Sequence, residues 1–187
     1  MHCFEPSIYT FGILSQNDFS KVNNIILNNF GLGKVNEERI LFYNKKGSGL
    51  ASLTKRDLAF LNIPFEESEK VEILTLDTYC QQKSINHISL LKIDVEGHEL
   101  DVFAGAKEMF AKRAIDIITF EFGGCNIDTR TFFKDFWLFF EKENMALYRF
   151  LPSKKLLKLD KYKESYEQFT TTNYLAIQKT INLNAFV

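Results

Sequence analysis

Three side chains that can take up a proton or bind a hydroxyl group stand within five residues of one another: Asp94, Glu96 and His98. They directly follow a short apolar run, and Gly97 lies among them. Helix capping and dipole matching could account for part of this acidity, because Asp and Glu are favoured at helix starts. Two carboxylates and an imidazole at this spacing exceed what a turn requires, so we interpret them as a candidate site.

The residues around this group predict a strand followed by a helix. Residues 88–93 are apolar and contain β-branched side chains, and from Gly97 to Lys112 apolar residues recur at helical spacing. Asp94 is therefore expected at the carboxyl edge of a sheet, where ligands bind to open parallel sheets. Residues 116–122 predict a second strand that also ends in an acid followed by glycines, so we expect Glu121 to lie beside Asp94.

The remaining segments alternate between strand and helix patterns, which favours a parallel α/β sheet. Further strands are expected at the start of the chain, ending at Phe4, and over residues 22–30, 39–43, 71–76, 145–151 and 171–177. Further helices are expected over residues 8–17, 77–82 and 130–144, the last with a wide aromatic face that we assign to the core. The less regular segments are a surface excursion at 53–65 with a short helix at 57–61, a solvated charge run at 66–70, an edge strand at 154–158, a turn or two of helix at 162–169 and a flexible tail from about residue 180.

Composition narrows the class of protein. The chain has 187 residues, 45% hydrophobic and 25% charged, which predicts one globular domain over residues 1–187. A net charge of −1 gives no electrostatic case for nucleic acid as a partner. No apolar run reaches membrane-spanning length and no signal peptide is recognisable, so we expect a soluble cytoplasmic protein. The scattered residues Cys3, Cys80 and Cys125 form no metal-binding or disulfide pattern, and we interpret them as buried or incidental thiols.

Several motifs together resemble the FkbM family of S-adenosylmethionine-dependent methyltransferases. The similarity covers nearly the whole chain, and its most specific part is LKIDVEGHE at residues 91–99, spaced from FEP at 4–6. The other matching stretches are residues 29–33, 48–53, 75–77, 120–122 and 173–176. The resemblance implies a class I methyltransferase fold, a Rossmann-like and mostly parallel sheet with an antiparallel last strand. Residues 145–151 and 173–177 would form its closing pair.

The resemblance also implies positions for the cofactor, S-adenosylmethionine. Glu5, which ends a strand, would hold the ribose hydroxyls, because a vicinal diol suits a bidentate acceptor. Asn29 would lie near the adenine. Asp94 would face the methyl group and the acceptor.

The implied reaction is methyl transfer to a hydroxyl of a sugar, glycan or natural product. It needs in-line alignment and removal of the acceptor's proton. Asp94, Glu96 and His98 are candidates for the base and for substrate-orienting groups, and Glu121 could hydrogen-bond the acceptor hydroxyl. A divalent cation held by Asp94, Glu96 and His98 is an alternative, although those spacings are awkward across a turn.

One departure from the family pattern sets the rival hypotheses. The family's first strand and glycine-rich loop precede the acid of the Phe-Glu-Pro motif, and they are missing from residues 1–187. That strand is normally central, so we expect a gap with unpaired backbone groups, in a fragment of a longer enzyme or in a rearranged sheet. The rivals are a non-catalytic interaction module that self-associates through an exposed sheet edge, and a metal-dependent hydrolase.

Overall fold

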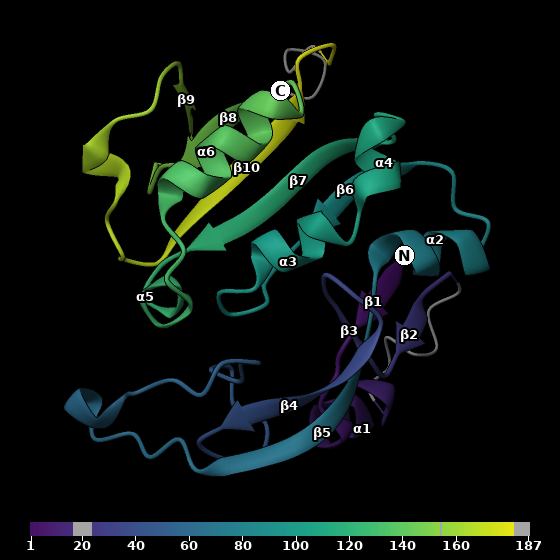
Figure 1. The fold of residues 1–187 in the computed structure, drawn as a ribbon, viewed down its shortest axis with the longest axis vertical. Helices are drawn as coiled ribbons and strands as arrows, with labels where there is room; N and C mark the ends of the chain where they lie inside the picture. The colour runs from purple at the N-terminus through teal and green to yellow at the C-terminus, as the bar shows by residue number, and fades with distance from the viewer. Residues whose placement is uncertain (17–23, 154, 182–187) are drawn as a thin grey trace.

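The strands of the computed structural model, which describes residues 1–16, 24–153 and 155–181, form three separate sheets (Figure 1). The largest is a five-stranded sheet whose strands, in spatial order, are β6 (Ile88–Lys92), β7 (Ile115–Phe122), β10 (Thr172–Gln178), β8 (Met145–Phe150) and β9 (Leu156–Leu159). Only β6 and β7 run parallel in it, because α3 and α4 between them supply the long crossover that parallel strands need. The expectation of a mostly parallel sheet is therefore wrong for this sheet.

The closing part of the five-stranded sheet agrees with the sequence. β10 pairs antiparallel with both β7 and β8, as expected for the last strand and its partner. β8 and β9 form an antiparallel hairpin, which fits the predicted edge strand near residues 154–158. Short connections of this kind can only join antiparallel strands.

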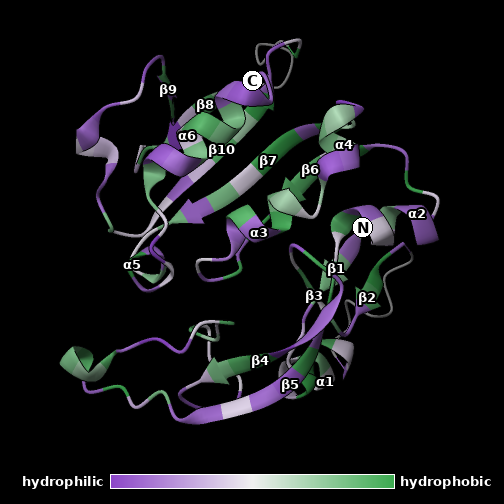
Figure 2. Ribbon diagram, in the orientation of Figure 1, coloured by the Kyte–Doolittle hydropathy of each residue, from purple (hydrophilic) through white to green (hydrophobic). Residues whose placement is uncertain are grey.

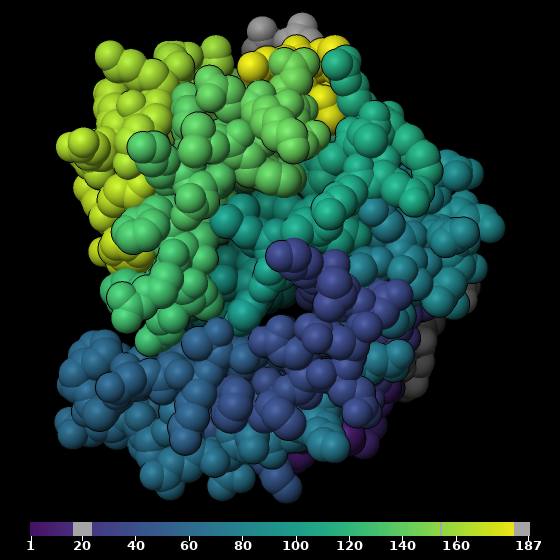
Figure 3. All heavy atoms as spheres, viewed as in Figure 1, coloured from purple at the N-terminus to yellow at the C-terminus, as the bar shows by residue number. Residues whose placement is uncertain are grey.

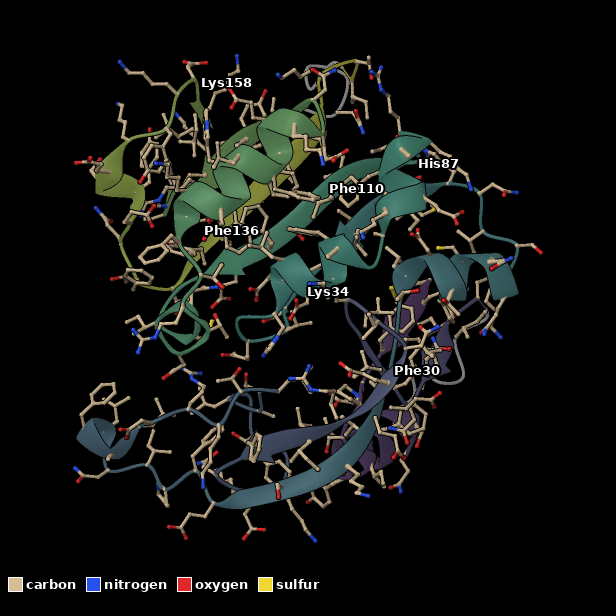
Figure 4. All side chains as sticks on the ribbon, in the orientation of Figure 1. Phe30, Lys34, His87, Phe110, Phe136 and Lys158 are labelled. Atoms are coloured by element: carbon tan, nitrogen blue, oxygen red, sulfur yellow. The ribbon has the colours of Figure 1, made fainter. Side chains whose placement is uncertain are left out.

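Three helices lie on one face of this sheet: α3 (Glu99–Ala104), α4 (Lys107–Ala111) and α6 (Phe133–Lys142) (Figure 1). Aromatic side chains fill the space between the layers, and Phe120 on β7 stacks on Phe136 on α6 with ring centroids 4.9 Å apart. Figure 4 labels Phe136 and Phe110 on helices that cover the sheet, and Figure 2 shows the hydrophobic residues of β6 and β7 beneath them. The aromatic face of α6 is core, as predicted.

The single helix expected from Gly97 to Lys112 is two helices. The chain bends at Gly105, where an added Cβ would lie 2.0 Å from the carbonyl oxygen of Gly33. A backbone segment thus passes so close that only glycine fits. The helical spacing of the apolar residues continues through the bend, which is why the sequence suggested one helix.

The N-terminal part contains the two smaller sheets. β1 (His2–Phe4) pairs parallel with β2 (Ile26–Asn28), and α1 (Ile8–Gln16) follows β1. β3 (Gly31–Leu32), β5 (Glu67–Leu74) and β4 (Glu37–Tyr43) form a three-stranded sheet in that order. Figure 2 shows β5 changing from hydrophilic to hydrophobic along its length.

Two expectations for this part need correction. The charge run at residues 66–70 is mostly exposed, as expected, but its backbone pairs with β4, so the strand predicted from residue 71 begins at Glu67. The strand expected over residues 22–30 is confined to β2, with residues 22 and 23 outside the described part and Gly31 beginning β3 instead of a turn. α2 (Leu76–Gln82) agrees with its prediction and is capped by the Thr75 hydroxyl, which accepts from the Thr78 amide at 3.0 Å.

Short helices account for the remaining differences. η2 (Ala59–Leu61) and η3 (Glu164–Tyr166) agree in place with short helices expected at 57–61 and 162–169. A further short helix, α5 (Cys125–Thr129), precedes the helix predicted from residue 130. Arg130 ends α5 with a left-handed φ of 58°, so the predicted helix, α6, begins at Phe133. Asn17 and the tail residues 182–187 lie outside the described part.

β1 and β6 belong to different sheets. Within the described residues, β1 pairs only with β2 and β6 only with β7. The gap expected from the sequence is therefore present, and it separates an N-terminal half (residues 1–16 and 24–75) from a C-terminal half (residues 88–181).

Candidate functional site

A cavity of about 630 Å³ lies where the two halves meet. Its walls include β1, the turn leading to α1, the loop at residues 47–53 and residues 90–96 at the end of β6. Figure 3 shows the surface hollowed at this junction. Glu5 and Asp94 both line this cavity, so two acids that end strands of different sheets face one space.

Asp94 and Glu121 lie at the carboxyl ends of β6 and β7. The Asp94 carboxylate accepts a hydrogen bond from the Lys92 ammonium at 2.9 Å, and both side chains are exposed. Burial raises the pKa of Glu121, and the nearby charge of Asp94 raises it further. The two carboxylates are thus close enough to interact, although Glu121 does not line the cavity.

Glu96 lies in a tight turn, where its own φ is 49° and that of Gly97 is 98°. Its side chain lines the cavity and accepts a hydrogen bond from Arg56 Nη1 at 3.0 Å. Burial raises the pKa of Glu96 to about 7, against the opposing effect of Arg56. A carboxyl with such a pKa can exchange a proton near neutral pH.

Both ring nitrogens of His98 have partners within the protein. Nδ1 lies 2.8 Å from Asp101 Oδ2, and Nε2 lies 3.0 Å from Thr54 Oγ1. The imidazole is mostly buried and lines the cavity wall beneath the turn. These two contacts tie His98 to Asp101 on α3 and to Thr54, so the ring links the turn to the segment around Thr54.

Glu5 and Asn29 are joined through the backbone. The Ser7 amide donates to Glu5 Oε1 at 2.8 Å, and burial raises the pKa of Glu5. The Asn29 amide group donates to the carbonyl oxygens of Glu5 and Pro6 at 2.9 and 3.2 Å. Asn29 is exposed and does not line the cavity, so it supports the turn that carries Glu5.

A buried bridge connects the turns that follow β6 and β7. Glu99 accepts from the Gly97 amide at 3.0 Å and from the Asn126 side chain at 3.4 Å. Asn126 in turn accepts from the Gly123 amide at 2.8 Å. Glu99 and Asn126 are almost completely buried. The pair fixes the spacing of the two turns, and Glu99 was not among the site residues predicted from the sequence.

Sequence reasoning also missed a set of polar residues around Glu96: Ser52, Thr54, Arg56 and Asp128. Arg56 donates to Asp128 Oδ2 at 3.0 Å as well as to Glu96. Thr54 and Arg56 lie in the segment 53–65 that was expected to be a surface excursion, and Ser52 directly precedes it. Ser52, Thr54 and Arg56 recur at every second position, but the pattern is short and Lys55 between them is also charged, so the sequence offered no clear signal.

Among the described residues, the other reactive groups do not form a second centre. In the described part of the chain, no group of three or more His, Cys, Asp and Glu side chains is arranged to hold a metal ion. Burial and nearby acids raise the pKa of the Cys125 thiol to about 12, so it stays protonated, in agreement with its assignment as a buried thiol. Nor do residues 1–16, 24–153 and 155–181 contain a helix long and apolar enough to cross a membrane.

Comparison with known proteins identifies the family of the chain. A family model described as the methyltransferase FkbM domain matches residues 2–150. No curated protein and no solved structure matches the chain. Because the model covers most of the sequence, including Glu5 and the 91–99 motif, the chain belongs to the FkbM methyltransferase family.

Proposed function

We propose that the chain is an S-adenosylmethionine-dependent methyltransferase that methylates a hydroxyl group of a sugar, glycan or natural product. The observation that carries the proposal is the cavity of about 630 Å³ lined by both Glu5 and Asp94. This volume falls within the usual range for small-molecule sites, and its walls combine apolar side chains with a few acids.

The residues present fit the cofactor's ribose. Only one of the two Glu5 carboxylate oxygens has a hydrogen-bond partner within the described residues, the Ser7 amide. The other oxygen is not a buried orphan, so a diol can reach it. Bound there, the cofactor would supply an electrophilic methyl group.

The acids at the carboxyl edge have separate roles in the proposed reaction. Asp94, held by Lys92, orients the acceptor hydroxyl, and Glu121, beside Asp94 but outside the cavity, accepts a hydrogen bond from a part of the acceptor that extends past the cavity. Glu96 takes the hydroxyl proton, since its pKa of about 7 matches a general base at neutral pH. His98 supports the turn and takes no proton.

Thermal unfolding of the chain with S-adenosylmethionine or S-adenosylhomocysteine tests cofactor binding. Ligand at a hundred times its dissociation constant adds about 2.7 kcal/mol, roughly 5 to 10 °C for a chain of this size. Glu5→Gln should remove most of the shift, because an amide accepts one diol hydrogen bond less favourably than a carboxylate. The matched control is Glu72→Gln, an exposed position on β5 outside the cavity. A folded sample without any saturable shift would contradict the proposal.

Among the residues that the structure describes, the second edge of β1 and that of β6 pair with no strand, which favours a second candidate, an interaction module that self-associates. The Ile26 amide donates to the Met1 carbonyl oxygen, and the Glu5 amide donates to the Asn28 carbonyl oxygen. The backbone groups of the odd-numbered residues in and beside β1 therefore point toward β2. Backbone groups alternate along a strand, so those of His2 and Phe4 point to the opposite edge. His2, Phe4 and Leu90 of β6 all line the cavity.

An unpaired strand edge is a template for pairing with another chain, here a second copy. Sedimentation velocity over a range of concentrations tests this candidate. Reversible dimers that Leu90→Pro abolishes would support it, and a monomer at all concentrations would exclude it. Leu157→Pro on β9, at the other edge of the sheet, is the control for a general effect of proline.

A further inference from the structure

Residues 52–56, which we call the strap, cross from the N-terminal half to the turn that carries Glu96. Ser52 Oγ donates to the Glu96 carbonyl oxygen at 2.9 Å, and Thr54 Oγ1 lies 3.0 Å from His98 Nε2. Arg56 completes the series with its bond to the Glu96 carboxylate. Alternate residues of the strap therefore point to the same side, as in an extended segment.

Arg56 joins two carboxylates that come from different parts of the C-terminal half. Its Nη1 donates to Glu96 and its Nε donates to Asp128 on α5, each at 3.0 Å. Its side chain is only 8% exposed, so both bonds form with little competing water. The planar guanidinium can present two donors in fixed directions, which a lysine ammonium cannot do in the same way.

The backbone of Glu96 also depends on the strap. A left-handed φ of 49° is uncommon for a residue other than glycine, and it persists only where neighbouring contacts hold it. The Ser52 hydroxyl supplies one such contact at the Glu96 carbonyl. The strap thus binds Glu96 through both its carbonyl and its carboxylate.

We propose that Arg56 is a positioning residue of this site: it binds Glu96 and Asp128 together and so fixes the direction in which the Glu96 carboxylate faces the cavity. The proposal deepens the proposed function, and rests on it, in that Glu96 is the group that takes the acceptor's proton. The contacts themselves do not depend on that role.

A consequence of this placement can be measured at Glu96 itself. Its surroundings raise the pKa of Glu96 through burial and the charges of Asp94, Glu99 and Glu121, whereas Arg56 lowers it. The Cys125 thiol also faces it and stays protonated, and Asp128 is joined to it through Arg56. Loss of Arg56 should therefore move the titration midpoint of Glu96 upward.

Carbon-13 NMR of the side-chain carboxyl of Glu96, followed from pH 4 to pH 10, tests the proposal. In Arg56→Met the midpoint should rise by about 1 to 3 pH units, the range for a carboxyl that loses an adjacent guanidinium. Arg56→Lys should give an intermediate rise, because the ammonium cannot hold both carboxylates. Lys55→Met removes an exposed charge one residue away and should leave the midpoint unchanged.

An unchanged Glu96 midpoint in folded Arg56→Met, or an equal rise in Lys55→Met, would overturn the proposal. If Arg56→Met does not fold by circular dichroism, Arg56→Lys decides: a midpoint equal to the wild-type value would mean that a point charge suffices and positioning is not needed. Failure of the proposed function is seen separately, because absence of cofactor binding by the wild-type chain does not alter the Glu96 titration.

Discussion

The two halves of the molecule differ in the size of their hydrophobic cores. In the C-terminal half, aromatic rings of α3, α6, β7 and β10 form one continuous buried cluster. In the N-terminal half, the separate core consists of Leu41, Tyr43, Val71 and Ile73. α1 has no buried residue, and Ile8 and Ile13 on it are exposed.

This difference divides the site. The C-terminal half supplies the acids of the carboxyl edge from a rigid sheet, whereas the N-terminal half supplies Glu5 and the strap from thinly packed elements. Regions with few buried apolar contacts open at lower free energy than the core. The wall of the cavity formed by the C-terminal half is therefore held by a large core. The wall formed by the N-terminal half depends on contacts between the two halves, among them Arg56 with Glu96 and Gly33 with Gly105.

The largest expected effect comes from truncating one buried side chain in each of the two cores and comparing the loss of stability. Phe136→Ala removes a fully buried ring from the aromatic cluster and should lower the free energy of unfolding by about 3 to 5 kcal/mol. Ile73→Ala in the small core should cost about 2 kcal/mol, at the low end for such substitutions, because its surroundings can relax. Urea unfolding followed by circular dichroism measures both values.

Hydrogen exchange shows whether the halves are separate units. Phe136→Ala should reduce amide protection throughout the chain, and Ile73→Ala should reduce it only in β3, β4 and β5. If Ile73→Ala reduced protection in β7 and β10 as much as in β3, β4 and β5, the two halves would unfold together and would not be separate units.

Gly105→Ala tests the close contact between the halves. The new methyl group would lie 2.0 Å from the Gly33 carbonyl oxygen, a backbone atom that cannot turn aside, so we expect a loss of about 3 kcal/mol. Gly12→Ala is the control, since it has open space in the middle of α1 and should stabilise the protein by about 0.5 to 1 kcal/mol. Thermal unfolding measures both effects: the midpoint should fall for Gly105→Ala and rise for Gly12→Ala. Shifts of the same sign in the two variants would contradict the prediction.

The sequence predicted best those features that depend on local pattern. The strand before Asp94, the aromatic face of α6 and the antiparallel closing pair followed from periodicity and family motifs, and all three are present. The gap beside β6 was also expected. These features are fixed by residues that lie close together in the chain or match a known motif.

Features that depend on tertiary contact could not be predicted. The bend at Gly105 exists because Gly33, 72 positions earlier, passes beside it. The roles of Arg56 and His98 depend on partners about 40 residues away, which periodicity does not report. Pairing with β4 likewise turned the charge run at residues 66–70 into strand, although its side chains give no strand signal.

The smallest predicted effect is the pH dependence that Glu96 gives to the free energy of unfolding. The folded-state pKa of Glu96 is about 7, above its ordinary value of 4.5, so between these pH values the folded chain binds more protons than the unfolded chain. Stability from this group is therefore complete below pH 4.5 and falls as pH rises through 7, by on the order of 2 kcal/mol. Glu96→Gln cannot titrate, so the free energy of unfolding of wild type minus that of Glu96→Gln should decrease over this range.

Glu72→Gln, at an exposed position of β5, should give a difference that does not change with pH. The opposite trend for Glu96, a difference that grows as pH rises, would mean that attraction to Arg56 outweighs burial of the carboxylate. In that case the contact between the two halves would be most stable when Glu96 is ionised. The strap would then hold the N-terminal wall of the cavity more strongly at neutral pH than its few buried apolar contacts suggest. With the expected trend, ionisation of Glu96 instead lowers the stability of the folded chain, because burying the carboxylate costs more free energy than its attraction to Arg56 returns.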